Sequence, residues 1–243
     1  LRKHAEAVKR EANKKFWNNT TGRFVGCIDQ EGKSHDYGFT FLNLDSIWYG
    51  TATDKHAREI MDWISGKRIV EGDTSTGTDI YHWRFGPRST TKRNIDWYCQ
   101  GWYLPETIPF GGQVQDGGAV LGFSFYDLWA RLKILGPDNA WNRLSEILDW
   151  EDEVEKAGGY RAYYSNPKLG ATLQGGGTAG GLGIDAEFFE SSLIPSFITM
   201  GFLGINPDAA SLHISPKLPS QCPDMGISNV LYRNVRLDIR AAD

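Results

Sequence analysis

One polar, glycine-rich stretch, Gln113-Val114-Gln115-Asp116-Gly117-Gly118, leads into the amphipathic run Ser124-Phe125-Tyr126-Asp127-Leu128-Trp129-Ala130-Arg131-Leu132. This order places a carboxylate, two side-chain amides and free backbone N–H groups at the mouth of a helix. Glycines on either side let the backbone approach a ligand closely, so a sugar or an anion could be held there. The alternative is that Asp116 is an ordinary turn or N-cap aspartate.

Hydrophobic periodicity outlines the rest of the chain. Apolar residues recur at three- and four-residue spacing, with glycine, proline and aspartate at the expected ends. The pattern predicts helices at 1–17, 41–52, 55–65, 94–102, 121–135, 139–156 and 186–203, with Asp54, Asp138 and Asp185 as caps. Alternation with period two predicts strands at 212–216 and 230–239.

The connections between these helices are unequal. Short turns follow some helices, whereas the segment 67–118 and the glycine-rich segment 173–183 are long. Long connections of this composition are usually functional. The sequence therefore predicts a mainly α fold, a partial (α/α) toroid of helical hairpins whose long loops share one face. Residues 1–204 would form this helical part and residues 205–243 a short C-terminal β segment.

Composition narrows the possible partners. The net charge of −4 and the pI of about 5.8 give no reason to expect nucleic acid or a membrane surface as a partner. Cys27, Cys99 and Cys222 follow no metal-binding or disulfide pattern. We therefore expect no metal and no cofactor. The cellular compartment is left open.

Aromatic content is the unusual number, with 9 Trp, 10 Tyr and 12 Phe. A Trp ring stacks well on the apolar face of a pyranose. Most of these side chains are expected in the core, but Trp48, Trp83, Trp97 and Trp102 lie in or beside polar sequence. A sugar-binding role is predicted for Trp48, Trp83 and Trp102.

Several segments, kept in order, resemble one family. They are Phe16-Trp17 to Gly22-Arg23-Phe24, Asp29 to Gly32, Leu42 to Gly50, Gln115-Asp116-Gly117-Gly118, Gly175 to Gly183, Gly201 to Gly204 and Leu212 to Pro219. Together the chain resembles the six-hairpin (α/α)6-barrel glycosidases, and among them the clan of cellobiose-type phosphorylases and related hydrolases. The resemblance implies the C-terminal half of such a barrel and the start of a β-sandwich.

The resemblance also implies a partner and a reaction. An upstream half of the barrel or another subunit would cover the helix faces that half a ring exposes. The substrate would be an oligosaccharide, and the general acid would lie upstream, outside this sequence. Asp116 stands where the family commonly has Asn, and Gln115 where the phosphorylases carry Glu, which argues against phosphorolysis.

Glycoside cleavage needs an acid and, with inversion, a base roughly 6.5–9.5 Å from it. Carboxylates predicted for the long-loop face are Asp36, Asp73, Asp79, Asp116, Asp185 and Glu187. Asp116 and Glu187 are the predicted catalytic residues. Glu187 also suits the first turn of a helix, where its charge meets the helix dipole.

The predicted substrate contacts surround these carboxylates. Gln113, Gln115, Arg84 and Arg88 would bind hydroxyl groups, and His35 and Asp36 would hydrogen-bond the ligand. The alternatives are a solvated His–Asp loop pair and a structural loop with surface arginines.

The sequence thus predicts an O-glycosidase that hydrolyses oligosaccharides with inversion. Two alternatives stay open. One is a disaccharide phosphorylase in which Arg84 and Arg88 clamp phosphate, and the other is a non-catalytic sugar-binding half-barrel.

Overall fold

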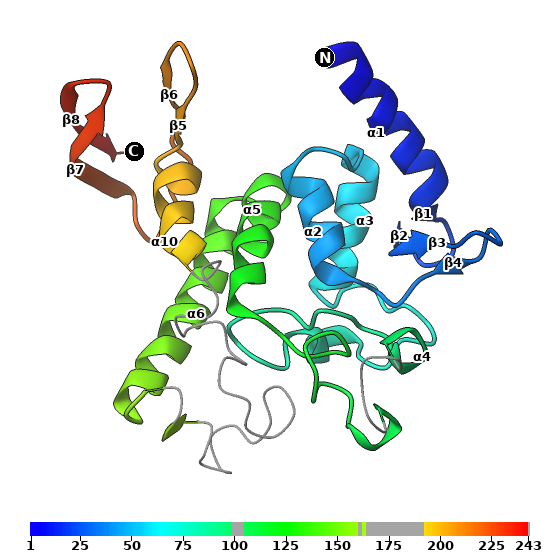
Figure 1. The fold of residues 1–243 in the computed structure, drawn as a ribbon. Helices are drawn as coiled ribbons and strands as arrows, with labels where there is room; N and C mark the ends of the chain where they lie inside the picture. The colour runs from blue at the N-terminus through cyan, green and yellow to red at the C-terminus, as the bar shows by residue number, and fades with distance from the viewer. Residues whose placement is uncertain (99–104, 160–161, 164–191, 243) are drawn as a thin grey trace.

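Packed helices form the centre of the structure (Figure 1). The structure is a computed structural model that describes residues 1–98, 105–159, 162–163 and 192–242. Helix α5 (Ser124–Ile134) packs against α2 (Thr40–Trp48), α3 (Asp54–Ile64), α6 (Pro137–Lys156) and α10 (Leu193–Phe197). The π-helical segment η6 (Ile198–Phe202) continues α10. α5 is therefore the element around which the other helices gather.

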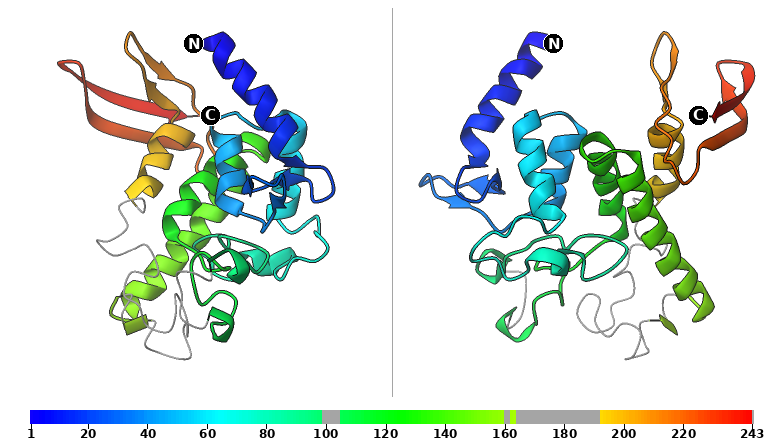
Figure 2. Two further views of the ribbon diagram at one scale, coloured as in Figure 1. Left: turned by 45° about the vertical axis from the view of Figure 1, so that its right-hand side comes forward. Right: turned by 180° about the vertical axis from the view of Figure 1, so that it is seen from behind.

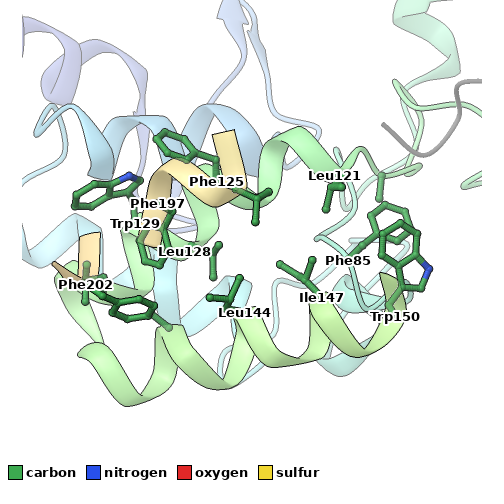
Figure 3. Close-up of a cluster of buried hydrophobic side chains, with 14 of the residues drawn as sticks. Phe85, Leu121, Phe125, Leu128, Trp129, Leu144, Ile147, Trp150, Phe197 and Phe202 are labelled. Carbon is green, nitrogen blue, oxygen red and sulfur yellow. The ribbon is translucent and has the colours of Figure 1, made fainter. Parts of the chain in front are cut away.

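The apolar stripe of α5 explains this central place. Its buried residues include Leu128 and Leu132, four positions apart, which face α6 and α10 rather than solvent. Figure 3 shows the resulting cluster, in which side chains from α5, α6, α10 and the loop residue Phe85 interdigitate. A second buried cluster joins α2 and α3 through Leu44, Ile60, Met61 and Ile64.

Short turns join the helix pairs at one end. Gly50, with φ of 73°, lies in the turn between α2 and α3, and Gly136, with φ of 93°, lies between α5 and α6. Pro137 follows as the first residue of α6, where its missing N–H costs nothing. The predicted helical hairpin at Gly136-Pro137 is thus confirmed.

Capping differs in detail from the prediction. Thr53, not Asp54, caps α3: its hydroxyl accepts a hydrogen bond from the N–H of His56 at 3.2 Å. Asp138 lies in the first turn of α6, and its carboxylate accepts hydrogen bonds from the N–H and hydroxyl of Ser220. Asp185 lies outside the described residues.

The long connections carry short helical turns. These are η1 (Gly77–Tyr81), α4 (Ile95–Tyr98), η3 (Pro105–Thr107) and η4 (Leu121–Phe123). α4 occupies part of the predicted helix at 94–102.

Strands form four two-stranded antiparallel sheets in the part of the chain that the structure describes. They are β1 (Trp17–Asn18) with β2 (Arg23–Phe24), β3 (Cys27–Ile28) with β4 (Ser34–His35), β5 (Ile205–Pro207) with β6 (Leu212–Ile214), and β7 (Asp224–Tyr232) with β8 (Val235–Ala242). Figure 2 shows the last two hairpins projecting beside α10.

The single strand predicted at 230–239 is wrong, because the chain reverses within it. Arg233 and Asn234 both adopt positive φ, 52° and 68°, and Tyr232 pairs with Val235 across the turn. Two consecutive positive φ angles are the geometry of a type I′ hairpin turn.

The predicted partial toroid is also wrong. The structure combines helices with small antiparallel sheets and does not indicate an (α/α) barrel. α1 (Arg2–Phe16), expected as a barrel helix, buries none of its residues, and its N-terminal part projects from the body (Figures 1 and 2). Periodicity identified helices correctly but carried no information about how they curve around one another. Strands do begin at Ile205, just after the predicted boundary at 204.

Candidate functional site

Three segments that are far apart in sequence meet at the lower end of α2, α3 and α5 in Figure 1. Backbone hydrogen bonds join them: Thr40 N–H donates to the Ser89 carbonyl at 2.9 Å, and Ser89 N–H donates to the Gly118 carbonyl at 2.6 Å. We call the segments 36–40, 88–92 and 113–118, with the adjoining residues 79–84 and 108–111, the loop end. The short turns lie at the opposite end of the helices, so long loops do converge on one side.

Asp116 is fully buried at the centre of the loop end. Its Oδ1 accepts a hydrogen bond from the N–H of Asn94, and its Oδ2 accepts one from Arg93 Nε, both at 2.9 Å. Arg93 also donates to the carbonyl of Ile108. The carboxylate therefore fastens the loop 108–116 to residues 93–94. In this arrangement neither oxygen is exposed to a substrate, and the predicted catalytic role stays a prediction.

Arg88 is the second fixed point of the loop end. Nη1 donates to the Gly117 carbonyl at 2.8 Å, and Nε and Nη2 contact the Asp79 carboxylate at 3.2 Å. The guanidinium lies between two rings, 4.8 Å from the centroid of Trp83 and 5.0 Å from that of Phe110. Every guanidinium nitrogen of Arg88 is engaged, so this side chain is not a free phosphate clamp.

Glycines allow this close packing. Gly111 has φ of 88°, and a Cβ there would lie 2.8 Å from Arg88 Nη1 and 3.1 Å from the Trp83 ring. A Cβ on Gly117 would lie 2.3 Å from the ring of Phe110. Asp116 and Trp83 are therefore neighbours through these glycines, as the shared-face prediction requires.

The two glutamines of the loop present free amides. Gln115 is exposed and Gln113 half-buried. Their backbone carbonyls are hydrogen-bonded, Gln115 to Asn94 Nδ2 at 2.6 Å and Gln113 to Gly118 N–H at 2.9 Å. Their side-chain amides have no hydrogen bond to any residue that the structure describes. Each amide offers two donors and one acceptor oxygen to a ligand.

Asp79 is the most accessible of the predicted carboxylates that the structure describes. Its side chain is 46% exposed, against 1% for Asp73, 1% for Asp116 and 12% for Asp36. Burial raises the pKa of Asp79, but hydrogen bonds and the charge of Arg88 outweigh it and hold the pKa below its usual value. His82 Nδ1 lies 3.4 Å from Asp79 Oδ1. A negative charge is thus maintained beside Trp83.

Asp36 is occupied by structural contacts. Its carboxylate accepts hydrogen bonds from Thr21 Oγ1 at 2.6 Å and Arg23 Nε at 2.7 Å, and also from Asn18 and Gly38. Neighbouring His35 pairs instead with Asp29 in the β3–β4 hairpin, at 2.9 Å, and its hydrogen bond lowers the pKa of Asp29. The structure does not bring the two predicted ligand contacts together on a substrate.

Tyr37 extends this part of the loop end. Its hydroxyl donates to Asp96 Oδ2 at 3.0 Å. Burial, helped by that hydrogen bond, raises the pKa of Tyr37 to about 12. The phenol is therefore neutral at physiological pH and acts as a hydrogen-bond donor.

Trp48 and Arg84 are placed elsewhere. Trp48 ends α2, eight residues from its start, so it lies about 12 Å along the helix from the loop end. Its ring packs on Trp129 at 3.9 Å, as a helix–helix contact. Arg84 is exposed and pairs with Glu153 of α6.

Trp102, Glu187 and the side chain of Trp97 lie outside what the structure describes. Arg93 and Phe110, in contrast, are not among the residues that the sequence selects, yet both hold the loop end together. Their signal was weak because each contacts a partner from another segment. No cluster of three or more potential metal ligands occurs among the described residues.

Comparison with protein-family models finds no match for this chain, and neither does a search of curated proteins. In the described part of the chain, no helix has both the length and the apolar character needed to cross a bilayer.

Proposed function

We propose that this protein acts on oligosaccharides as a glycoside hydrolase, with the sugar bound at the loop end. The observation that carries the proposal is the contact of three distant loops around Trp83, Arg88 and Asp116. Functional residues are often supplied by loops that a rigid scaffold positions. The resemblance of the ordered motifs to six-hairpin glycosidases supplies the chemistry.

The exposed groups at the loop end suit a sugar. Trp83 is half-buried, so one part of its ring contacts Arg88 while another remains accessible for stacking. The amides of Gln113 and Gln115 would bind hydroxyl groups beside it. Asp79 is ionised and partly exposed, and would accept a hydrogen bond from a hydroxyl or from the attacking water.

Asp116 takes a different part in this proposal. Because its two oxygens are bound to Arg93 and Asn94, it would position the loop that carries both glutamines. Asp116 would then affect sugar binding without touching the sugar.

The test is turnover by the full chain on a panel of β- and α-linked disaccharides and aryl glycosides, with and without inorganic phosphate. We expect release of free reducing sugar that does not depend on phosphate. The anomer of the first product, followed by NMR, reports inversion. Asp79→Asn should lower kcat/KM at least about tenfold, whereas Asp152→Asn, an exposed change on α6, serves as the matched control. Formation of sugar phosphate would contradict hydrolysis.

A second candidate is sugar binding without turnover, which the burial of Asp116 favours. It predicts that oligosaccharides shift NMR signals of the loop end while no panel member is cleaved. Trp83→Ala would abolish those shifts. Absence of both binding and turnover would reject both candidates.

A further inference from the structure

A pocket of about 330 Å³ lies between α1, β2 and α2, and no loop-end residue lines it. Pockets of this size accommodate small organic molecules. Its walls and floor are mostly apolar, and are formed chiefly by Phe16, Phe24, Leu42, Asp45, Ser46 and Tyr49.

The α1 wall of the pocket is fixed by contacts that need no ligand. Asn13 Nδ2 donates to the carbonyl of Thr51 at 2.7 Å, and Asn13 Oδ1 lies 2.7 Å from His56 Nδ1. The His56 ring stacks on Trp17, with centroids 3.6 Å apart and planes 8° apart. Because these contacts join α1 to α3 and to the turn after α2, the pocket is preformed.

Asp45 is the chemical anomaly of this pocket. Its Oδ1 is buried and has no hydrogen-bond partner among the described residues. Burial alone raises the pKa of Asp45 to about 6, with no basic group acting on it. An unpaired buried carboxylate is costly, and a native structure that keeps one calls for an explanation. The hydroxyl of Ser46 offers no relief, because it donates to the carbonyl of Asn43 at 2.6 Å.

We propose that this pocket binds a small organic ammonium, whose N–H group donates to Asp45 while its apolar part packs against Phe16, Phe24 and Tyr49. The charges are complementary, and the surrounding aromatic faces favour a cation further. A saccharide fits less well, because it would need several polar partners and the walls supply few. A neutral hydrocarbon would leave Asp45 without a partner.

The probe for this proposal is benzylamine, which is charged at pH 7.5, titrated into the full chain and followed by NMR. We expect saturable shifts at residues of α1 and α2. Benzyl alcohol, which has a similar shape and no charge, should bind at least about tenfold more weakly.

Asp45→Asn keeps the shape of the side chain and should also weaken benzylamine binding at least about tenfold. Since this substitution removes an unpaired charge, the variant should unfold at the same temperature or higher, which separates lost binding from misfolding. Asp62→Asn, on the partly exposed face of α3, should bind benzylamine like the unchanged protein.

Equal binding of benzylamine and benzyl alcohol, or equal binding to Asp45→Asn and the unchanged protein, would overturn the proposal. So would the absence of saturable shifts. Sugar binding at the loop end is measured separately and neither outcome there affects this result.

Discussion

The loop end and the α1–α2 pocket both bury carboxylates, but they treat them in opposite ways. At the loop end Asp73 receives Arg23 Nη1 at 2.5 Å and Asp116 receives Arg93 Nε at 2.9 Å. In the pocket Asp45 receives no hydrogen bond from any described residue on its buried oxygen. Burial by itself therefore does not separate a structural carboxylate from one that is available to a ligand. The inventory of partners does.

This difference has an energetic meaning. A paired buried charge becomes expensive when one partner is removed, because the other is left behind without compensation. An unpaired one is expensive already, so removing its charge relieves the folded state. The two regions should respond to the same kind of substitution with opposite signs.

Asp73→Ala should produce the largest effect. It leaves the Arg23 guanidinium, which is 1% exposed, with Asp36 as its remaining carboxylate. We expect a loss of about 3 kcal/mol in the free energy of unfolding, measured from urea transitions. Asp152→Ala, which breaks the exposed pair with Lys156, should leave the transition unchanged. Indistinguishable curves for the two variants would refute a stabilising role for the buried pair.

Gly117→Ala should have an intermediate effect. The new Cβ must occupy a backbone with φ of 82° and would lie 2.3 Å from the Phe110 ring, which packs on Arg88. Backbone strain and overpacking together should cost about 2–3 kcal/mol. Gly136→Ala has similar strain, with φ of 93°, and open space around the Cβ, so it should cost about 1 kcal/mol. Thermal or urea unfolding of both variants isolates the packing term, and equal losses would show that Phe110 does not constrain the loop.

Asp45→Asn should show the smallest effect and the opposite sign. The pKa of Asp45 is raised from 3.8 to about 6 in the folded protein. The folded state therefore holds the proton more tightly than the unfolded chain, and ionisation above pH 6 penalises it. The substitution should stabilise the protein at pH 7.5 by about 1 kcal/mol, a figure reduced for the screening of the exposed part of the side chain.

This gain should fade as the pH falls through 6 and be absent near pH 4, where Asp45 is protonated in both states. Urea unfolding at the two pH values measures it, with Asp62→Asn as the baseline. A gain of equal size at both pH values would mean that the charge of Asp45 is not its source.

Local signals in the sequence predicted much of the fold. The stop at Gly136-Pro137 located the α5–α6 hairpin, and the periodicity of 1–17 located α1. The hairpin turn at Arg233-Asn234 was missed because it contains no glycine, the usual residue where φ is positive. The toroid was wrong because helix order does not determine how the helices pack around one another.

The candidate site was predictable in its location and less so in its roles. The glycines and polar residues at 113–118 do belong to a point where loops meet. The partners of Asp116 and Arg88, however, lie 23 and 29 residues away, at Arg93 and Gly117. No local pattern reports a contact of that range, so a buried, paired aspartate and an exposed one look alike in sequence. Asp45 was missed for the same reason, since a lone acid within a helix does not reveal its burial.

The turn at Gly136 offers a practical entry to this molecule. A Cβ there would meet no atom within 4 Å, and the turn lies at the end of the helices opposite to the loop end. A cysteine introduced at this turn would give a fluorescent label or a surface tether an attachment point remote from the sugar loops. Immobilised through that position, the protein would present its loops to solution, which is the orientation that a carbohydrate array requires.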